Sequence, residues 1–81
     1  MMPHLTVYSR QYCHLCEDML AALEVLRGEF SFELHVVDVD GDAALLARYD
    51  ELVPLLATPQ GELCHYFLDQ AAVRAYLAEV K

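Results

Sequence analysis

The spacing of hydrophobic and polar residues changes several times along the chain, and each change predicts a structural element. Alternating or short β-branched apolar runs between turn residues predict strands, whereas apolar residues three or four positions apart predict helices. The segments with strand character are His4–Tyr8, Phe32–Val39, Val53–Ala57 and Glu62–Phe67. The segments with helical character run from Cys16 to just before Gly28, from Ala43 to Tyr49, and onward from Asp69. The predicted order is therefore β-α-β-α-β-β-α.

Turn and cap residues between these segments indicate how the strands pair. Asp42 and Asp69 each stand where a helix N-cap is needed, and Gly28 suits the position after a helix C-terminus. The first helical crossover favours parallel, right-handed pairing of its two strands. The tight turn around Pro59 and Gly61 makes the last two strands antiparallel. We predict an α/β fold with a mixed four-stranded sheet and helices on both faces, in a single domain over residues 1–81.

Composition and charge narrow the function. The chain has 81 residues, of which 57% are hydrophobic, so a short chain can still build a dense core. Its formal net charge of -8, without any cluster of lysine or arginine, would repel phosphate backbones and anionic membrane surfaces. No targeting segment or membrane-length apolar run is evident. We therefore expect a cytoplasmic monomer that binds neither nucleic acid nor membrane.

The chemistry of the chain is concentrated in the sequence Cys-His-Leu-Cys at residues 13–16, where the first strand gives way to a helix. Unpaired N–H groups and the dipole at a helix N-terminus favour a thiolate there, and His14 adds positive charge beside Cys13. Glu17 and Asp18 act in the opposite direction. The three-residue offset brings the sulfur of Cys16 close enough to Cys13 for a disulfide. We expect an exposed Cys13 with a pKa below the free-cysteine value of about 8.5, and a more buried Cys16. The alternative is a pair of helix-start cysteines without a redox role.

Other candidate sites are weaker. The acidic turn that begins at Asp38 has its glycine at the fourth position and not at the sixth, and Tyr49 stands where a calcium loop needs its final carboxylate. A zinc set of Cys13, Cys16, Cys64 and His65 would draw its two halves from distant segments, unlike the closely spaced pairs of structural zinc sites. Cys64 is therefore predicted to be a structural residue of the last strand. We interpret His4 and His35 as edge or surface residues and not as ligands.

Two segments resemble a known family. Residues 8–16 run from a strand into Ser9, a basic residue, two further residues and the cysteine pair, as in glutaredoxins, where the pair is Cys-Pro-Tyr-Cys. Residues 52–54, Leu-Val-Pro, resemble the Val-Pro element before the third strand of thioredoxin-fold proteins. With the matching element order, the chain resembles a small glutaredoxin-like protein of the thioredoxin-fold superfamily. The resemblance implies a thioredoxin-like fold and thiol–disulfide exchange.

The resemblance also implies roles for individual residues. Cys13 would be the nucleophile and Cys16 the resolving thiol. The substrate-binding residues would be Arg10, facing a glutathione carboxylate; Tyr12, in place of the thioredoxin tryptophan; Val53, as a backbone docking site; Pro54, as a cis-proline facing the cysteines; and Asp69, as the acidic residue after the last strand.

The chain departs from the glutaredoxin pattern at two places. His14-Leu15 replaces Pro-Tyr between the cysteines, and residues 66–69 lack the Gly-Gly that follows the fourth strand. We therefore expect no bound cofactor and at most weak binding of glutathione. The predicted function is a thiol–disulfide oxidoreductase or electron carrier that acts on protein disulfides, or on small disulfides and thiols. The alternative is a non-catalytic thioredoxin-fold module that binds a peptide or a metal in the groove where the oxidoreductase would bind its substrate.

Overall fold

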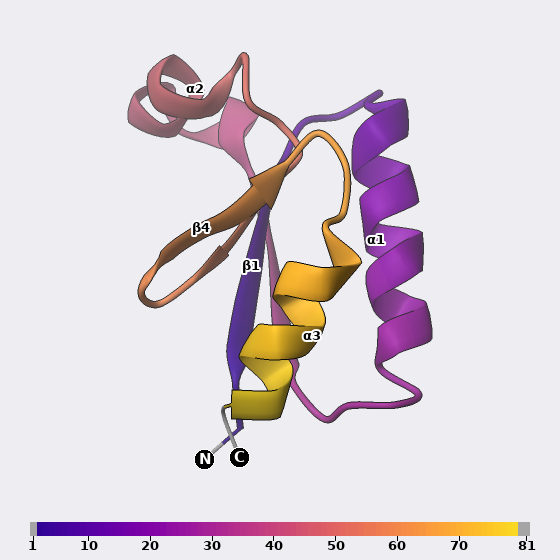
Figure 1. Ribbon diagram of the computed structural model, residues 1–81. Coiled ribbons are helices and arrows are strands. Elements are labelled where there is room, and N and C mark those ends of the chain that lie inside the picture. The colour runs from indigo at the N-terminus through magenta and orange to yellow at the C-terminus, as the bar shows by residue number, and fades with distance from the viewer. Residues whose placement is uncertain (1, 80–81) are drawn as a thin grey trace.

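A computed structural model describes residues 2–79, and its elements follow the predicted order (Figure 1). The strands are β1 (His4–Ser9), β2 (Glu33–Asp38), β3 (Leu55–Thr58) and β4 (Gly61–His65). The helices are α1 (His14–Leu26), α2 (Ala43–Tyr49) and α3 (Gln70–Glu79), and a 3-10 turn, η1 (Val39–Gly41), precedes α2. Within the described residues, no helix has the length and apolar character needed to cross a bilayer.

The strands form one mixed sheet in the order β2-β1-β3-β4. The crossover through α1 leaves β1 and β2 parallel, with His4 paired with Glu33 and Ser9 with Asp38. β3 runs antiparallel to both β1 and β4, and its pairing with β4 is the one that the tight turn predicts. β1, one of the two inner strands, leads directly into the segment that carries the cysteine pair.

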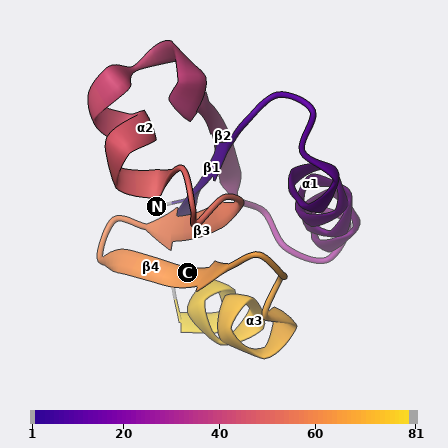
Figure 2. The same cartoon turned by 90° about the horizontal axis from the view of Figure 1, so that it is seen from above.

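Helices cover both faces of the sheet, but unequally (Figure 2). α1 and α3 pack on one face, where the alternate β1 residues Leu5 and Val7 are fully buried. α2 lies on the other face, where Tyr49 stacks on Tyr8 with ring centroids 4.5 Å apart. The main core cluster consists of Leu5, Val7, Met19, Leu23, Leu26, Phe32, Leu56, Val73 and Leu77. His4, at the opposite end of β1 from Tyr8, is exposed.

Local contacts explain why the helices begin where they do. The Oδ1 atom of Asp42 accepts the backbone N–H of Ala44 at 2.9 Å and caps α2. The Oδ1 atom of Asp69 accepts the N–H of Ala72 at 3.1 Å in the first turn of α3. Both aspartates therefore act as the predicted N-caps.

Several predicted boundaries were wrong. β3 begins at Leu55 and not at Val53, because Pro54 has no N–H to donate to a ladder. β4 ends at His65, because Tyr66 adopts a left-handed backbone with φ 65° that cannot continue a strand. α1 begins at His14, two residues before the predicted start, so both cysteines belong to its N-terminus. Val36 pairs with the buried Val7 but is 53% exposed, because β2 is an edge strand.

Candidate redox site

Cys13 occupies the N-cap position of α1. Its backbone is extended, with φ -114° and ψ 106°, and its Sγ accepts the backbone N–H of Cys16 at 3.2 Å. Cys16 lies one turn along the helix, with its Cα 5.2 Å from that of Cys13, and the two sulfurs form a disulfide. A sulfur atom here takes the place of the serine or aspartate oxygen that usually caps a helix.

The two sulfurs differ in their exposure. Cys16 is only 3% exposed and belongs to the buried face of α1, together with Met19 and Leu23. Cys13 is partly exposed. A partner molecule can therefore reach Cys13 first, and the predicted difference in burial is confirmed.

The surroundings of Cys13 favour negative charge on its sulfur in the reduced protein. The first turn of α1 directs unpaired N–H groups and the positive end of the helix dipole toward the cap. The N–H of Cys16 already points at this sulfur. The side chains of His14 and Glu17 are exposed, so solvent and salt screen the opposing effects of their charges. The backbone N–H groups of α1 should therefore stabilise a Cys13 thiolate more than these exposed side chains do.

Two of the predicted substrate-binding residues are engaged by the chain itself. The Nε atom of Arg10 donates to the Oδ1 atom of Asp40 at 3.0 Å, and its Nη2 lies 2.9 Å from the same oxygen. Asp69 caps α3. Arg10 was predicted to face a carboxylate of glutathione, but in the structure it faces the carboxylate of Asp40 in η1. Both Arg10 and Asp40 remain partly exposed, so this ion pair is weak enough to open.

Tyr12 directly precedes the reactive cysteine and is fully exposed. Its backbone is left-handed, with φ 57°, a conformation that a residue with a side chain adopts at a cost of about 1–3 kcal/mol. The structure thus presents an aromatic ring to solvent beside Cys13.

Pro54 is buried, and the Val53–Pro54 peptide bond is cis, as the resemblance implied. Tyr8 pairs with Leu55 in the antiparallel β1–β3 ladder. Continuing this register places Pro54 opposite Ser9, at the end of the sheet from which the chain leads to Cys13. The carbonyl of Pro54 accepts the backbone N–H of Tyr66 at 2.8 Å, which joins the segment after β4 to the same end.

An apolar groove beside the cysteine pair was missed by sequence reasoning, which assigned residues 66 and 67 to a strand. The groove holds about 300 Å³ and is lined by residues of α1 and of the segment that joins β4 to α3. Both parts of the chain can be followed in Figure 1. Its lining residues are Leu15, Asp18, Met19, Ala22, Tyr66, Phe67, Leu68 and Gln70. Phe67 is 70% exposed, and Leu15 lies between the two cysteines. The sequence feature that could have indicated this groove is the pair Tyr66-Phe67, which stands where glutaredoxins have Gly-Gly.

Cys64 is the third cysteine and does not belong to the Cys13–Cys16 pair. Burial raises the pKa of its thiol, and the carboxylates of Asp69 and Glu62 add to the effect, although the backbone N–H of Asp69 lowers the pKa. Its side chain packs against the core, as predicted for a structural residue. Within residues 2–79, the group of three or more ligand-type side chains close enough to share an ion is His4, Glu33 and His35. The zinc set that includes Cys64 and His65 is therefore not assembled.

Together these features define a thioredoxin-fold protein with an adjacent cysteine pair at the start of its first helix. The sequence profile of the glutaredoxin-like domain (DUF836) matches residues 4–78. The chain therefore belongs to the glutaredoxin-like domain family. No curated protein is similar enough to count as a match.

Solved structures support the same assignment. Protein Ne2328 from Nitrosomonas europaea is 46% identical, with a TM-score of 0.85 over 95% of this chain and 93% of its own. Structural genomics target protein XcR50 from X. campestris is 37% identical, with a TM-score of 0.74 over 95% of this chain and 99% of its own. A thioredoxin from Fasciola hepatica is 18% identical, with a TM-score of 0.62 over 99% of this chain and 82% of its own, and it shows the fold alone.

Proposed function

We propose that this protein is a thiol–disulfide oxidoreductase that acts through Cys13 and Cys16. The observation that carries the proposal is the position of the pair: an accessible sulfur caps α1, and a buried sulfur lies within bonding reach one turn deeper. A helix N-terminus lowers the pKa of a thiol, and the thiolate is the nucleophile in disulfide exchange.

The proposed reaction begins with the reduced protein. The Cys13 thiolate attacks one sulfur of the substrate disulfide, so that a mixed disulfide forms and the other substrate sulfur leaves as a thiolate. Cys16 then loses its proton and attacks the Sγ of Cys13. The second substrate thiol leaves and the Cys13–Cys16 disulfide closes. The substrate gains two electrons and the protein loses two, which an external thiol reductant returns.

A protein disulfide is the substrate class that we propose. The exposed ring of Tyr12, which directly precedes Cys13, and the groove that includes Leu15 and Phe67 offer apolar contacts to an extended chain. Glutathione is a poorer fit, because the net charge of -8 opposes an anionic tripeptide and its carboxylate would have to displace Asp40 from Arg10. We propose that no cofactor is bound and that the protein works as a monomer in a reducing compartment such as the cytoplasm, where a dithiol can be regenerated.

Redox titration combined with turnover tests the proposal. The purified protein would be equilibrated in thiol–disulfide buffers of graded potential, and the fraction of oxidised Cys13–Cys16 measured by alkylation and mass. We expect a reversible two-electron couple, together with catalysed reduction of a protein disulfide.

Three variants sharpen this test. Cys13→Ser removes the nucleophile and should lower turnover by about 10³-fold or more. Cys16→Ser should instead accumulate a mixed disulfide with the substrate, because nothing resolves it. Cys64→Ala is the matched control and should retain turnover. A protein that binds a peptide through the groove but shows no reversible couple would instead be the non-catalytic binding module.

A further inference from the structure

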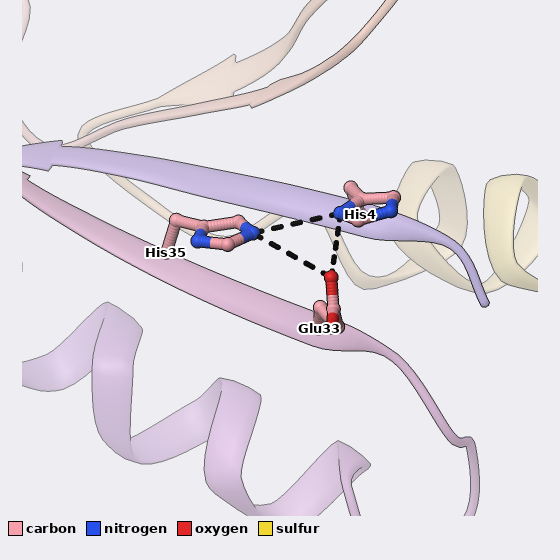
Figure 3. A group of neighbouring side chains, drawn as sticks. All are labelled: His4, Glu33 and His35. Carbon is pink, nitrogen blue, oxygen red and sulfur yellow. Dashed lines mark hydrogen bonds and ion pairs between the residues drawn. The ribbon is translucent and has the colours of Figure 1, made fainter.

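A second cluster of chemically active side chains lies at the other end of the sheet. It consists of His4 at the start of β1 and of Glu33 and His35 on β2 (Figure 3). His4 pairs with Glu33 in the parallel ladder, and His35 lies two residues further along β2 on the same face. This is the face opposite α1 and α3. The distance along β1 from His4 to Ser9 is about 17 Å, so the cluster is remote from the cysteines.

The three ligand atoms are spaced as around a single ion. The Nδ1 atom of His4 lies 2.9 Å from the Oε2 of Glu33 and 3.5 Å from the Nε2 of His35, and the third side of the triangle is 3.8 Å. These lengths leave a point about 2.0 Å from all three atoms, and zinc binds nitrogen and carboxylate oxygen at about 2.0–2.2 Å. An ion could therefore bind all three atoms where they already lie.

The orientation of the rings agrees with the spacing. The imidazole planes are within 6° of parallel, and the two nitrogens face one another while the carboxylate oxygen approaches both from the same side (Figure 3). The lone pairs that bind a metal lie in the ring planes, so both nitrogens can serve one ion. All three side chains are about half exposed, which leaves room for a water as fourth ligand.

Backbone contacts hold the strands that carry these ligands. The N–H of Glu33 donates to the carbonyl of Pro3 at 2.9 Å, and the hydroxyl of Tyr76 donates to the carbonyl of His4 at 3.2 Å. The start of β1 is thus fixed both to β2 and to α3, so the sheet sets the backbone positions from which the three ligands extend.

We propose that His4, Glu33 and His35 form a binding site for one divalent transition-metal ion, with Zn²⁺ as the matching ion. Two imidazoles and one carboxylate are a ligand set that suits zinc, whereas Ca²⁺ and Mg²⁺ prefer oxygen ligands alone. A bound ion would tie the amino ends of β1 and β2 together and stabilise the folded chain by an amount that grows with the logarithm of the free ion concentration once this exceeds Kd.

Zinc titration of the oxidised, untagged protein tests the proposal, because the disulfide keeps the thiols of Cys13 and Cys16 from binding the metal. Calorimetry should show one Zn²⁺ per chain, and zinc should raise the thermal midpoint. Loss of an outer-shell partner of a metal ligand already lowers affinity about 10–100-fold, so His4→Gln and His35→Gln should each weaken binding at least about tenfold. Glu33→Gln should do the same, and Ca²⁺ should not compete.

The chain offers a matched control in His65, whose Nδ1 lies 2.6 Å from the Oε2 of Glu62 in an exposed pair that has no third ligand among residues 2–79. His65→Gln should leave the zinc affinity unchanged. Far-UV circular dichroism of each variant establishes that it is folded. Absence of binding to the oxidised wild-type protein would overturn the proposal. So would zinc binding that survives His4→Gln and His35→Gln, or that depends on His65.

Discussion

The two ends of the sheet carry chemical groups in contrasting ways. At the carboxyl end of β1 the side chains stand on irregular backbone: Tyr12 and Tyr66 are left-handed, and Pro54 follows a cis bond. At the amino end, His4 and Glu33 are direct partners in an undistorted parallel ladder. A loop end can aim a reactive atom at a partner molecule, whereas a ladder sets fixed distances between side chains. The first suits exchange with a large substrate, and the second suits an ion.

The ends also differ in how they are supported. At the carboxyl end of β1, the loop end, the side chains of Cys13 and Asp69 cap α1 and α3. Cys16, one turn into α1, is part of the core. At the amino end of β1, the strand end, the side chains of His4, Glu33 and His35 are half exposed and contribute little to packing. Substitutions at the loop end should therefore change folding stability, and those at the strand end should not.

The largest effect on stability is expected at the cap of α3. Asp69→Ala should lower the free energy of unfolding by about 1 kcal/mol, whereas Asp69→Asn should keep most of it, because asparagine also caps helices. Urea denaturation of the oxidised protein measures both. His35→Gln is the control from the strand end and should stay within about 0.5 kcal/mol of wild type. Equal losses in the Ala and Asn variants would contradict the assignment of Asp69 as a cap.

A smaller and opposite effect is expected at Tyr12. Tyr12→Gly relieves the left-handed backbone but gains chain entropy in the unfolded state, so we expect a net stabilisation of about 0.5–1 kcal/mol. The same variant should raise KM for a protein disulfide with little change in kcat, because it removes only binding contact. Tyr12→Asn tolerates the same backbone and also lacks the ring, so it should show the same KM change. Unchanged KM in both variants would remove Tyr12 from the docking surface.

The smallest effect concerns Cys64, the free thiol of the oxidised protein. Because the folded state raises its pKa, the unfolded chain loses this proton first as pH rises. The contribution of Cys64 to stability is thus complete below the ordinary thiol pKa and is lost through the alkaline range. Cys64→Ala should flatten the fall in the urea midpoint between about pH 7 and about pH 10. A steeper fall in the variant would reverse the assigned direction.

The sequence predicted those features that depend on neighbours along the chain. The element order, the caps at Asp42 and Asp69, and the cysteine pair at a helix start are local patterns. What it missed depends on contacts between distant segments. His4 and His35 are 31 positions apart, and only the register of β1 on β2 brings them together. Arg10 and Asp40 are separated by 30 positions and meet for a similar reason. The position of Val36 at a sheet edge, which determines its exposure, also needs the strand order.

The sulfur cap of α1 joins the chemical state of the protein to the state of a helix. The atom that accepts the Cys16 N–H is the same atom that would exchange partners with a substrate. A thiolate accepts this hydrogen bond more strongly than a sulfur in a disulfide. Reduction and ionisation of Cys13 therefore replace the covalent link between Cys13 and Cys16 by a stronger hydrogen bond across the first turn of α1. Each cycle of disulfide exchange would therefore change what holds the first turn of a helix whose buried residues Met19, Leu23 and Leu26 belong to the core. Amide hydrogen exchange at the start of α1 would follow the oxidation state of the protein as directly as any chemical assay of its thiols.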